Sequence, residues 1–341
     1  MPFCRDKRKP HNCFLKGSVE RAGPPALCIF TQTETGKTPG SGQSFEWQES
    51  SGSWLCFGGL TPRMKFPDTA RYRVAQIRAG LSARSALKSY LMKAALVTGA
   101  SKGIGAATAR LLKEHGYFVY LHGRNLKDLR NLENELAQED STLVADFADA
   151  TSVPAMVTQL QEKISRHHAG LQVLVNNAGI YHRHTSEEGR WDLWEKQFRV
   201  NILSPARLTE LLIPILKAHP PASIINVSSC LGLRPVAGVG AYSATKAAMI
   251  NWTKTLALEL GTAKIRVNCV CPGIVDTPIH DFHLLPPEQK SHVLKQMSEL
   301  QPLGRIGEPN EIAQAISFLA SDQSSWTTGA VLTVDGGINL K

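Results

Sequence analysis

The chain has 341 residues, which is enough for one large hydrophobic core and a small accessory segment. Its formal net charge of +9 is unevenly distributed, because residues 1–91 hold 14 of the 38 basic and 6 of the 29 acidic side chains and so carry +8. Residues 92–341 therefore carry only +1, which argues against nucleic-acid binding by that part. No apolar run reaches the roughly 18 residues that a membrane span needs.

Cysteine usage points to a reducing compartment. The seven cysteines are an odd number, are scattered and include no Cys-x-x-Cys pair. Neither a disulfide framework nor a zinc site is expected from such spacing. His280 and His283 lack a neighbouring carboxylate or cysteine arrangement, so we predict no metal.

Residues 1–91 are predicted to form a poorly ordered, basic extension. They show no sustained helical or strand period, and they contain turn-forming clusters at residues 22–25 and 35–42. Residues 71–88 are rich in Arg, Ala and Leu and are compatible with a basic amphipathic helix of a transit region. A mitochondrial or plastid location is thus the alternative to a cytoplasmic one. The other interpretations are a regulatory arm, or an upstream stretch absent from the working protein, with Met92 as its start.

From Lys93 onward, strand and helix patterns alternate with short connections. Such alternation predicts a single α/β domain at residues 92–341, a Rossmann-like, doubly wound parallel sheet of seven strands with helices on both faces. The predicted strands are 94–98, 117–122, 142–145, 173–176, 223–227, 266–270 and 331–334. The predicted helices are 106–114, 126–138, 153–166, 191–218, 242–260 and 311–320.

A glycine-rich turn follows the first strand of this domain. Gly99, Gly103 and Gly105 separate an apolar strand from an Ala/Leu-rich helix. Glycine tolerates positive φ and lets the backbone approach a phosphate, while the helix N-terminus offers free N–H groups and a partial positive charge. The turn therefore predicts a nucleotide-binding site.

A second pattern supplies acid–base chemistry. Tyr242 and Lys246 are four residues apart, so on a helix they share one face, and Ser229 lies thirteen residues earlier at a strand end. A free tyrosine has a pKa near 10 and exchanges protons poorly at neutral pH. Lowering that pKa to about 7 needs about 4 kcal/mol of preferential stabilisation of tyrosinate. A nearby ammonium has the charge that this requires.

With these motifs, residues 92–341 resemble the short-chain dehydrogenase/reductase family, and most closely its 3-oxoacyl-carrier-protein reductase and carbonyl reductase branches. The resemblance implies a catalytic tetrad of Asn201, Ser229, Tyr242 and Lys246. Tyr242 would exchange the proton, Lys246 would assist it and hold the nicotinamide ribose, Ser229 would stabilise the substrate oxygen, and Asn201 would hold a water. Ser228 is the rival for the serine role, but Ser229 has the family's spacing to Gly232.

The resemblance also implies a set of cofactor contacts, made by the glycine turn, by loops after four strands and by two members of the tetrad. These residues are Gly99, Ser101, Lys102, Gly103, Ile104, Gly105, Arg124, Asp146, Phe147, Asn177, Ala178, Gly179, Tyr242, Lys246, Pro272, Gly273, Ile274 and Thr277. Gly123 stands where NAD-selective enzymes place an acid, so we expect no carboxylate to repel a 2′-phosphate. Lys102 and Arg124 would pair with that phosphate, and we predict NADP(H) as the cofactor.

The predicted function is NADP(H)-dependent interconversion of a carbonyl and a secondary alcohol, with 3-oxoacyl thioesters as the nearest substrate guess. That guess is weakened at Pro220 and Ala263, where some family members carry basic residues that dock acyl carrier protein. Residues 278–303 are expected to form a lid over a small-molecule substrate, and the family's usual assembly implies a homotetramer or a dimer. The alternative function is a cofactor-binding regulatory or scaffold protein that keeps the fold without turnover.

Overall fold

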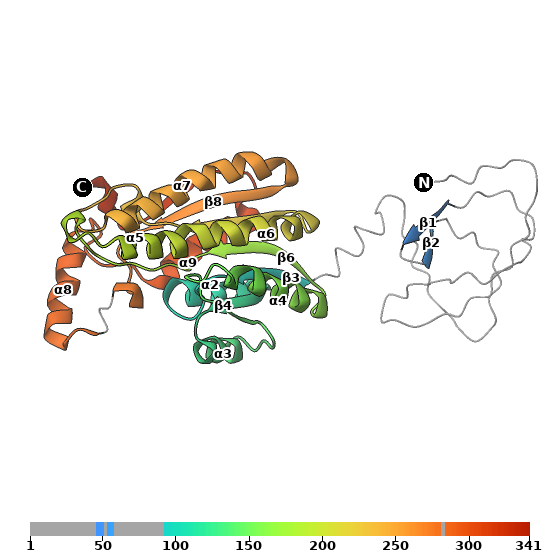
Figure 1. Cartoon of the computed structure of the whole chain (residues 1–341), viewed down its shortest axis with the longest axis horizontal. Coiled ribbons are helices and arrows are strands. Elements are labelled where there is room, and N and C mark those ends of the chain that lie inside the picture. Colours follow the sequence, from blue (N-terminus) through green and yellow to red (C-terminus); the bar gives the residue numbers. More distant parts are fainter. Residues whose placement is uncertain (1–45, 51–52, 58–91, 281–283) are drawn as a thin grey trace, which may run out of the picture. The chain divides into compact units, whose positions relative to one another are not determined.

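The computed structural model describes residues 46–50, 53–57, 92–280 and 284–341 (Figure 1). The chain divides into two units, Met1–Arg78 and Ala79–Lys341. In the first, β1 (Glu46–Ser50) pairs antiparallel with β2 (Ser53–Phe57). Sequence patterning did not predict this hairpin, because each strand is only five residues long and shows no sustained alternation. The predicted basic helix at 71–88 lies outside the described residues.

The second unit is built on a parallel sheet of seven strands in the order β5-β4-β3-β6-β7-β8-β9. The strands are β3 (Met92–Val97), β4 (Phe118–Gly123), β5 (Thr142–Val144), β6 (Ala169–Asn176), β7 (Ala222–Val227), β8 (Ile265–Pro272) and β9 (Val331–Val334). All seven predicted strands are present. The doubly wound Rossmann-like fold is therefore confirmed.

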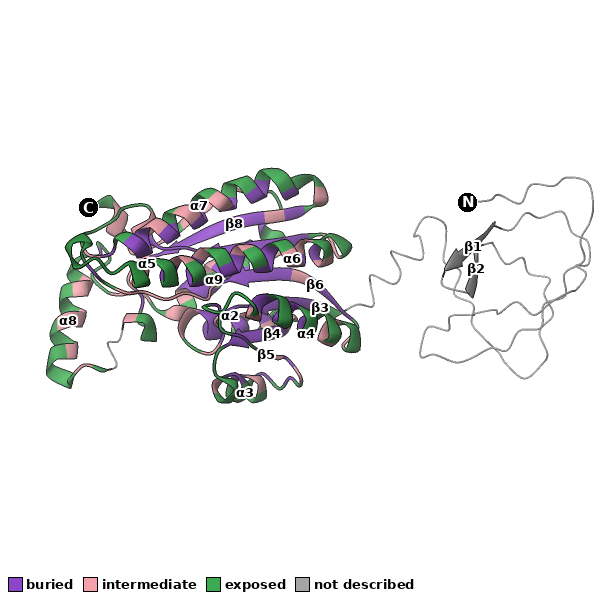
Figure 2. Ribbon diagram, viewed as in Figure 1, coloured by how far each residue is buried: buried purple, intermediate pink, exposed green. Residues whose placement is uncertain are grey.

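Helices cover both faces of this sheet. The α-helices of this unit are α2 (Gly103–Glu114), α3 (Leu126–Glu135), α4 (Ser152–Arg166), α5 (Trp191–Phe198), α6 (Ser204–Ala218), α7 (Gly240–Leu260), α8 (Pro287–Glu299), which lies off the sheet, and α9 (Pro309–Ala320). Side chains of α4, α6 and α7 form one hydrophobic core with the sheet, and those of α2, α3 and α9 form another. Figure 2 shows the result as buried strands between helices whose outer faces are exposed. Burial on both sides explains why the strands read as continuous apolar runs.

The order of the strands fixes where a ligand can bind. The chain runs outward in one direction through β3, β4 and β5 and in the other through β6 to β9, so the direction of winding changes between β3 and β6. Open α/β sheets bind ligands at such a switch point, beyond the carboxyl ends of the strands. Thr98 and Asn177 stand at those two ends, and the Asn177 N–H donates to Thr98 Oγ1 at 2.9 Å.

Two segments differ from the sequence prediction. The helical stretch predicted at 191–218 is present, but a π-helical turn at Arg199–Leu203, which the sequence did not predict, separates α5 from α6. This turn accompanies the burial of Asn201, whose side chain is hydrogen-bonded to the backbone of Ile180. The helix α8 was not predicted, because its residues are largely polar and none of them is buried. It lies within the predicted lid segment, whose lid function stays a prediction.

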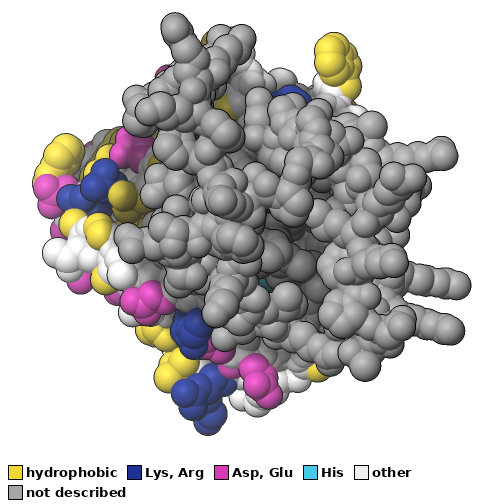
Figure 3. Space-filling model, turned by 90° about the vertical axis from the view of Figure 1, so that its right-hand side faces the viewer, with side chains coloured by type: hydrophobic (Ala, Val, Ile, Leu, Met, Phe, Trp, Pro, Cys, Tyr) yellow, Lys and Arg dark blue, Asp and Glu magenta, His cyan; other side chains and the backbone are white. Residues whose placement is uncertain are grey.

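The exposed surface of the described residues carries charges of both signs. Where described side chains are visible in Figure 3, basic and acidic ones lie side by side along the rim. This mixture agrees with the charge of +1 that the sequence gives for residues 92–341. In the described part of the chain, no helix has both the length and the apolar character to cross a membrane.

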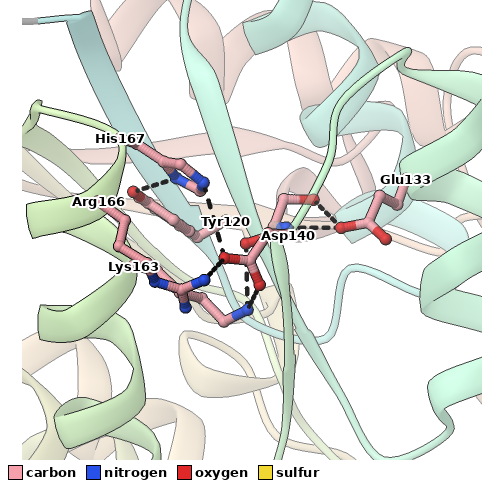
Figure 4. A network of polar contacts seen from close by, with 7 residues as sticks. Tyr120, Glu133, Asp140, Lys163, Arg166 and His167 are labelled. Carbon is pink, nitrogen blue, oxygen red and sulfur yellow. Dashed lines mark hydrogen bonds and ion pairs between the residues drawn. The ribbon is translucent and has the colours of Figure 1, made fainter.

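A partly buried network of polar side chains connects the C-terminal end of α4 to the loop after α3 (Figure 4). Asp140 forms ion pairs with Lys163 and Arg166, and its Oδ2 lies 3.7 Å from Nε2 of His167, whose ring is hydrogen-bonded to the Tyr120 hydroxyl at 3.1 Å. Burial opposes the charge of Asp140, but the hydrogen bond from Lys163 and the neighbouring positive charges hold its pKa below the ordinary value. The network therefore favours the ionised carboxylate in the folded state.

We expect Asp140→Asn to lower the free energy of unfolding by roughly 1 kcal/mol at pH 7, since its carboxyl is only partly shielded from solvent. Because the folded-state pKa is depressed, this stabilisation is present above the unfolded-state pKa and is lost as pH falls through the folded-state value. Denaturant titrations of both proteins between pH 7 and pH 3 measure it. Glu139→Gln is the neighbouring control, and equal stabilities of the wild type and the Asp140 variant at pH 7 would contradict the expectation.

Candidate active site

The glycine turn adopts the geometry that its sequence predicted. Gly99 and Gly103 have φ values of 64° and 54°, in the left-handed region that favours glycine. A Cβ on Gly105 would lie 2.1 Å from the carbonyl oxygen of Gly99, so only glycine fits there. Lys102 is the N-cap of α2 and its side chain makes no capping hydrogen bond. The first-turn N–H groups of this helix therefore face the switch point without a side-chain cap.

The far side of the turn is held by the loop after β6. The Asn177 side-chain amide donates to the carbonyl oxygens of Thr98 and Gly99 at 2.8 and 3.2 Å. A Cβ on Gly99 would lie 2.9 Å from Cα of Ala178. The backbone of the turn and that of Ala178 are thus in close contact.

His122, which the sequence analysis did not select, lies beside the glycine turn. Its ring is 2% exposed, and Nδ1 is 3.4 Å from the backbone nitrogen of Gly99 while Nε2 is 3.2 Å from the carbonyl oxygen of Ala145. The ring stacks on Phe147, with centroids 4.2 Å apart. The signal for it was a histidine in an otherwise apolar strand, directly before Gly123.

Two of the residues expected to contact the cofactor, both after β5, have different environments. Asp146 is exposed, and its Oδ1 accepts a hydrogen bond from the backbone N–H of Ala148 at 3.0 Å. The side chain of Phe147 is 2% exposed and stacked under His122. A contact from Phe147 to a bound nucleotide would therefore come from its backbone.

The structure places a carboxylate where the sequence analysis expected none. Asp128 lies in the first helical turn of α3, and its Oδ2 is 3.4 Å from Nζ of Lys102 in the glycine turn. Position 123 carries no acid, as the sequence shows, but the carboxylate of Asp128, five residues later in the chain, reaches the same neighbourhood. Lys102 is thus already paired, while Arg124 is exposed.

The loop after β8 closes the same site. Cys271 and Pro272 are buried, and a Cβ on Gly273 would lie 2.7 Å from Cα of Asp335. A Cβ on Gly103 would lie 3.1 Å from Cγ2 of Thr277, so this loop meets the glycine turn directly. Ile274, also expected to contact the cofactor, is partly exposed in the same loop, as is Ser101 in the glycine turn.

Ser229 and Tyr242 converge although thirteen residues separate them. Both are 8% exposed, and the Ser229 hydroxyl is near enough to the Tyr242 hydroxyl to affect its pKa. Burial raises the pKa of Tyr242 above its ordinary value, and the neighbouring Ser229 hydroxyl opposes that rise. The protein groups alone therefore do not produce the lowered pKa that the sequence analysis sought. Ser228, the rival serine, instead donates to the backbone oxygen of Lys246 at 2.8 Å.

Lys246 lies on the same helix, one turn after Tyr242. Its Nζ is 5.6 Å from the centre of the Tyr242 ring and donates to the carbonyl oxygen of Val227 at 2.9 Å. Burial lowers the pKa of Lys246 to about 8, so the ammonium form prevails at neutral pH. Two free thiols, Cys269 and Cys271, are buried nearby, with 3.9 Å between their sulfur atoms.

Asn201 completes the group from the π-helical turn. Its Oδ1 accepts from the Ile180 N–H at 2.9 Å, and its Nδ2 donates to the Ile180 oxygen and to Thr245 Oγ1. A Cβ on Gly179 would lie 3.4 Å from Asn201 Oδ1 and 3.6 Å from Lys246 Nζ. The missing side chain at Gly179 therefore leaves the space between these two polar groups open.

The rings of Tyr181 and His280 form an aromatic wall beside Tyr242. Motif analysis did not identify this wall. The Tyr181 ring stands edge-on to the Tyr242 ring, with centroids 4.9 Å apart, and the His280 ring lies 6.1 Å from that of Tyr181. No short motif marks Tyr181, so only the fold brings it here. Within the described ranges, no cluster of three His, Cys, Asp or Glu side chains is arranged to hold a metal ion.

These features fit a dinucleotide. The uncapped start of α2 suits a pyrophosphate, the glycine positions that exclude a Cβ suit a closely approaching backbone, and the buried ammonium suits ribose hydroxyls. The start of α2, the glycine positions and Lys246 surround the switch point between β3 and β6. Ser229 follows β7, on the opposite side of that point from α3, which follows β4.

Comparisons with known proteins agree with this geometry. Residues 99–339 match a family model described as enoyl-(acyl carrier protein) reductase. The chain is 38% identical over 247 residues to a 3-oxoacyl-[acyl-carrier-protein] reductase of Chlamydia muridarum (strain MoPn / Nigg), covering 72% of this chain and 97% of that protein. It is 35% identical to a cis-4-hydroxycyclohexanecarboxylate dehydrogenase of Sinomonas cyclohexanicum, covering 73% and 98%.

A solved structure described as a short chain dehydrogenase/reductase family protein matches with a TM-score of 0.64 and 31% identity, covering 73% of this chain and 98% of that one. The family implies a nicotinamide cofactor and action on a carbonyl or an alcohol. From the family model, which spans more than half of the chain, and from these relatives, we conclude that the chain belongs to the short-chain dehydrogenase/reductase family.

Proposed function

We propose that this oxidoreductase uses NADP(H) to interconvert a carbonyl and a secondary alcohol, with Tyr242 as the proton donor and acceptor. The observation that carries this proposal is the convergence of Ser229, Tyr242 and Lys246 beside the switch point of the sheet. The relatives act on dissimilar compounds by name, so the substrate is proposed only as a small carbonyl or alcohol, 3-oxoacyl thioesters included.

The chain's own groups divide the work. A bound nicotinamide supplies or accepts the hydride. Ser229 donates a hydrogen bond to the substrate oxygen and stabilises the charge that develops there. Tyr242 transfers its hydroxyl proton to that oxygen, and its tyrosinate form is stabilised by the ammonium of Lys246. A water between Asn201 and Lys246, in the space beside Gly179, would return the proton from solvent.

The preference for NADP(H) rests on charge. Lys102 and Arg124 lie on the turn and on the loop after β4, where charge-assisted hydrogen bonds to a 2′-phosphate are possible. Asp128 acts against this preference, because it is paired with Lys102 and would have to share it with the phosphate. We therefore propose a moderate preference for NADPH over NADH rather than an absolute one.

Lys102→Gln tests this assignment. We expect it to lower kcat/KM for NADPH about tenfold, or about 1.4 kcal/mol, and to leave kcat/KM for NADH within a factor of two. Steady-state rates with both cofactors measure it, and Lys127→Gln is the control on the next helix. A wild type that prefers NADH, or a Lys102 variant that loses both cofactors equally, would contradict the NADP(H) assignment.

The proposal includes a homo-oligomer, either a tetramer or a dimer. Large apolar side chains are exposed on α9 and in the segments after it, among them Phe318, Trp326 and Leu340, at 42%, 100% and 88% exposure. Burial of such side chains against another subunit would stabilise an oligomer. A scaffold protein without turnover is the rival function, and NADPH oxidation over a panel of carbonyl compounds separates the two.

A further inference from the structure

We infer that His122 is a positioning residue for the nucleotide, one that holds the glycine turn against the loop after β5, which begins at Ala145, through the two nitrogens of its ring. The inference rests on the proposed function, since it concerns how the dinucleotide site is kept in shape. His122 has no part in the proton transfer described above. It is a buried titratable group within a strand that is otherwise apolar.

The contacts of His122 join three consecutive strand ends. Its backbone oxygen accepts the N–H of Ala100 at 2.8 Å, and its Nδ1 faces the N–H of Gly99 at 3.4 Å, both in the turn after β3. Its Nε2 faces the carbonyl oxygen of Ala145 at 3.2 Å, after β5. Stacking on Phe147 fixes the plane of the ring and so aims both nitrogens.

The partners assign one protonation state. Gly99 offers an N–H, so Nδ1 must accept, and Ala145 offers a carbonyl oxygen, so Nε2 must carry the hydrogen. Only the neutral ring with its proton on Nε2 makes both bonds. Burial lowers the pKa of His122 to about 4, with the hydrogen bond to Ala145 and the charge of Asp146 opposing that shift, so this neutral form prevails at pH 7.

Gly99 connects the contacts of His122 to the proposed nucleotide site. Asn177 holds the carbonyl oxygens of Thr98 and Gly99, while His122 holds the N–H of Gly99 from the other side. Gly99 is thereby fixed at a φ of 64°, which shapes the approach to the start of α2. The Ala145 contact positions the neighbouring Asp146, one of the proposed cofactor contacts. Loss of both bonds should release these two loops and leave Tyr242 undisturbed.

Three variants test the inference. His122→Met keeps a similar length and removes both hydrogen bonds, His122→Asn is polar but too short to reach both partners, and His122→Gln retains an acceptor and a donor on a longer chain. We expect the Kd for NADPH to rise about tenfold in the Met variant, three- to fivefold in the Asn variant and less than threefold in the Gln variant. Calorimetric titration measures Kd, and kcat at saturating NADPH should stay within a factor of two.

The outcomes separate this inference from the proposed function. A wild type that does not bind NADPH or NADH refutes the proposed function. A wild type that binds, together with Met and Asn variants of unchanged Kd, refutes the positioning role alone. A Gln variant as weak as the Met variant also refutes it, because the hydrogen bonds would then not be the cause. If the Met variant does not fold, the Asn and Gln variants still decide the question.

Discussion

Replacing Tyr242 with phenylalanine is expected to lower kcat for carbonyl reduction about 10³-fold, near the middle of the range that a positioned acid contributes. The change removes one oxygen from a side chain that is 8% exposed and whose hydroxyl lies near that of Ser229. The ring remains to pack against Tyr181. The substrate oxygen then has no proton donor, while the nucleotide contacts of the glycine turn are untouched.

Rates and nucleotide binding are to be measured on the same preparation. The Kd for NADPH should stay within a factor of two, so the loss falls on kcat. Tyr117→Phe is the matched control, because Tyr117 directly precedes β4 and so lies at the amino ends of the strands, whereas the site lies beyond their carboxyl ends. Tyr117 lines a separate cavity of about 150 Å³ with Lys93 and Arg266. Undiminished turnover by the Tyr242 variant would refute its role as the acid.

Replacing Lys246 with methionine is expected to lower kcat about 10²-fold and to raise the KM for the cofactor about tenfold. The lysine is 3% exposed, and its ammonium is the proposed partner of both tyrosinate and the nicotinamide ribose. Methionine keeps the length and the apolar stem but carries no charge. Lys254→Met, an exposed position two turns further along α7, is the control.

The pH profile distinguishes a loss of charge from a loss of packing. Burial lowers the pKa of Lys246 to about 8, so its ammonium is present below that pH and is lost above it. The kcat of the wild type should therefore fall as pH rises through about 8, and this fall should be absent from the Lys246→Met profile. Parallel profiles in the two proteins would show that the lysine acts only by filling space.

Much of this site follows from local patterns. The strand–turn–helix at residues 94–114 was predictable because glycine spacing and an apolar run are short-range signals. The shared face of Tyr242 and Lys246 follows from helical periodicity alone. The order of alternating elements then implies a parallel sheet, which brings the loops after β3 and β6 to one edge.

What could not be predicted depends on contacts between distant residues. Asp128 pairs with Lys102 because α3 packs beside α2, and no spacing rule gives that distance. His122 acquires its role from Gly99, Ala145 and Phe147, which lie 23 to 25 residues away. The π-helical turn at Asn201 likewise depends on Ile180. In each case a polar side chain is held by groups that another loop or helix supplies.

The most direct test is the fate of a deuterium atom. NADPH that carries deuterium at the transferring position of the nicotinamide is incubated with the wild type and a panel of 3-oxoacyl thioesters and cyclic and open-chain ketones, and the alcohols are analysed by mass spectrometry. If Ser229, Tyr242 and Lys246 form a hydride-transferring site, at least one product carries one deuterium on its carbinol carbon. The Tyr242→Phe variant should form that labelled product about 10³-fold more slowly than the wild type. Binding of NADPH without deuterium transfer to any carbonyl compound would contradict it.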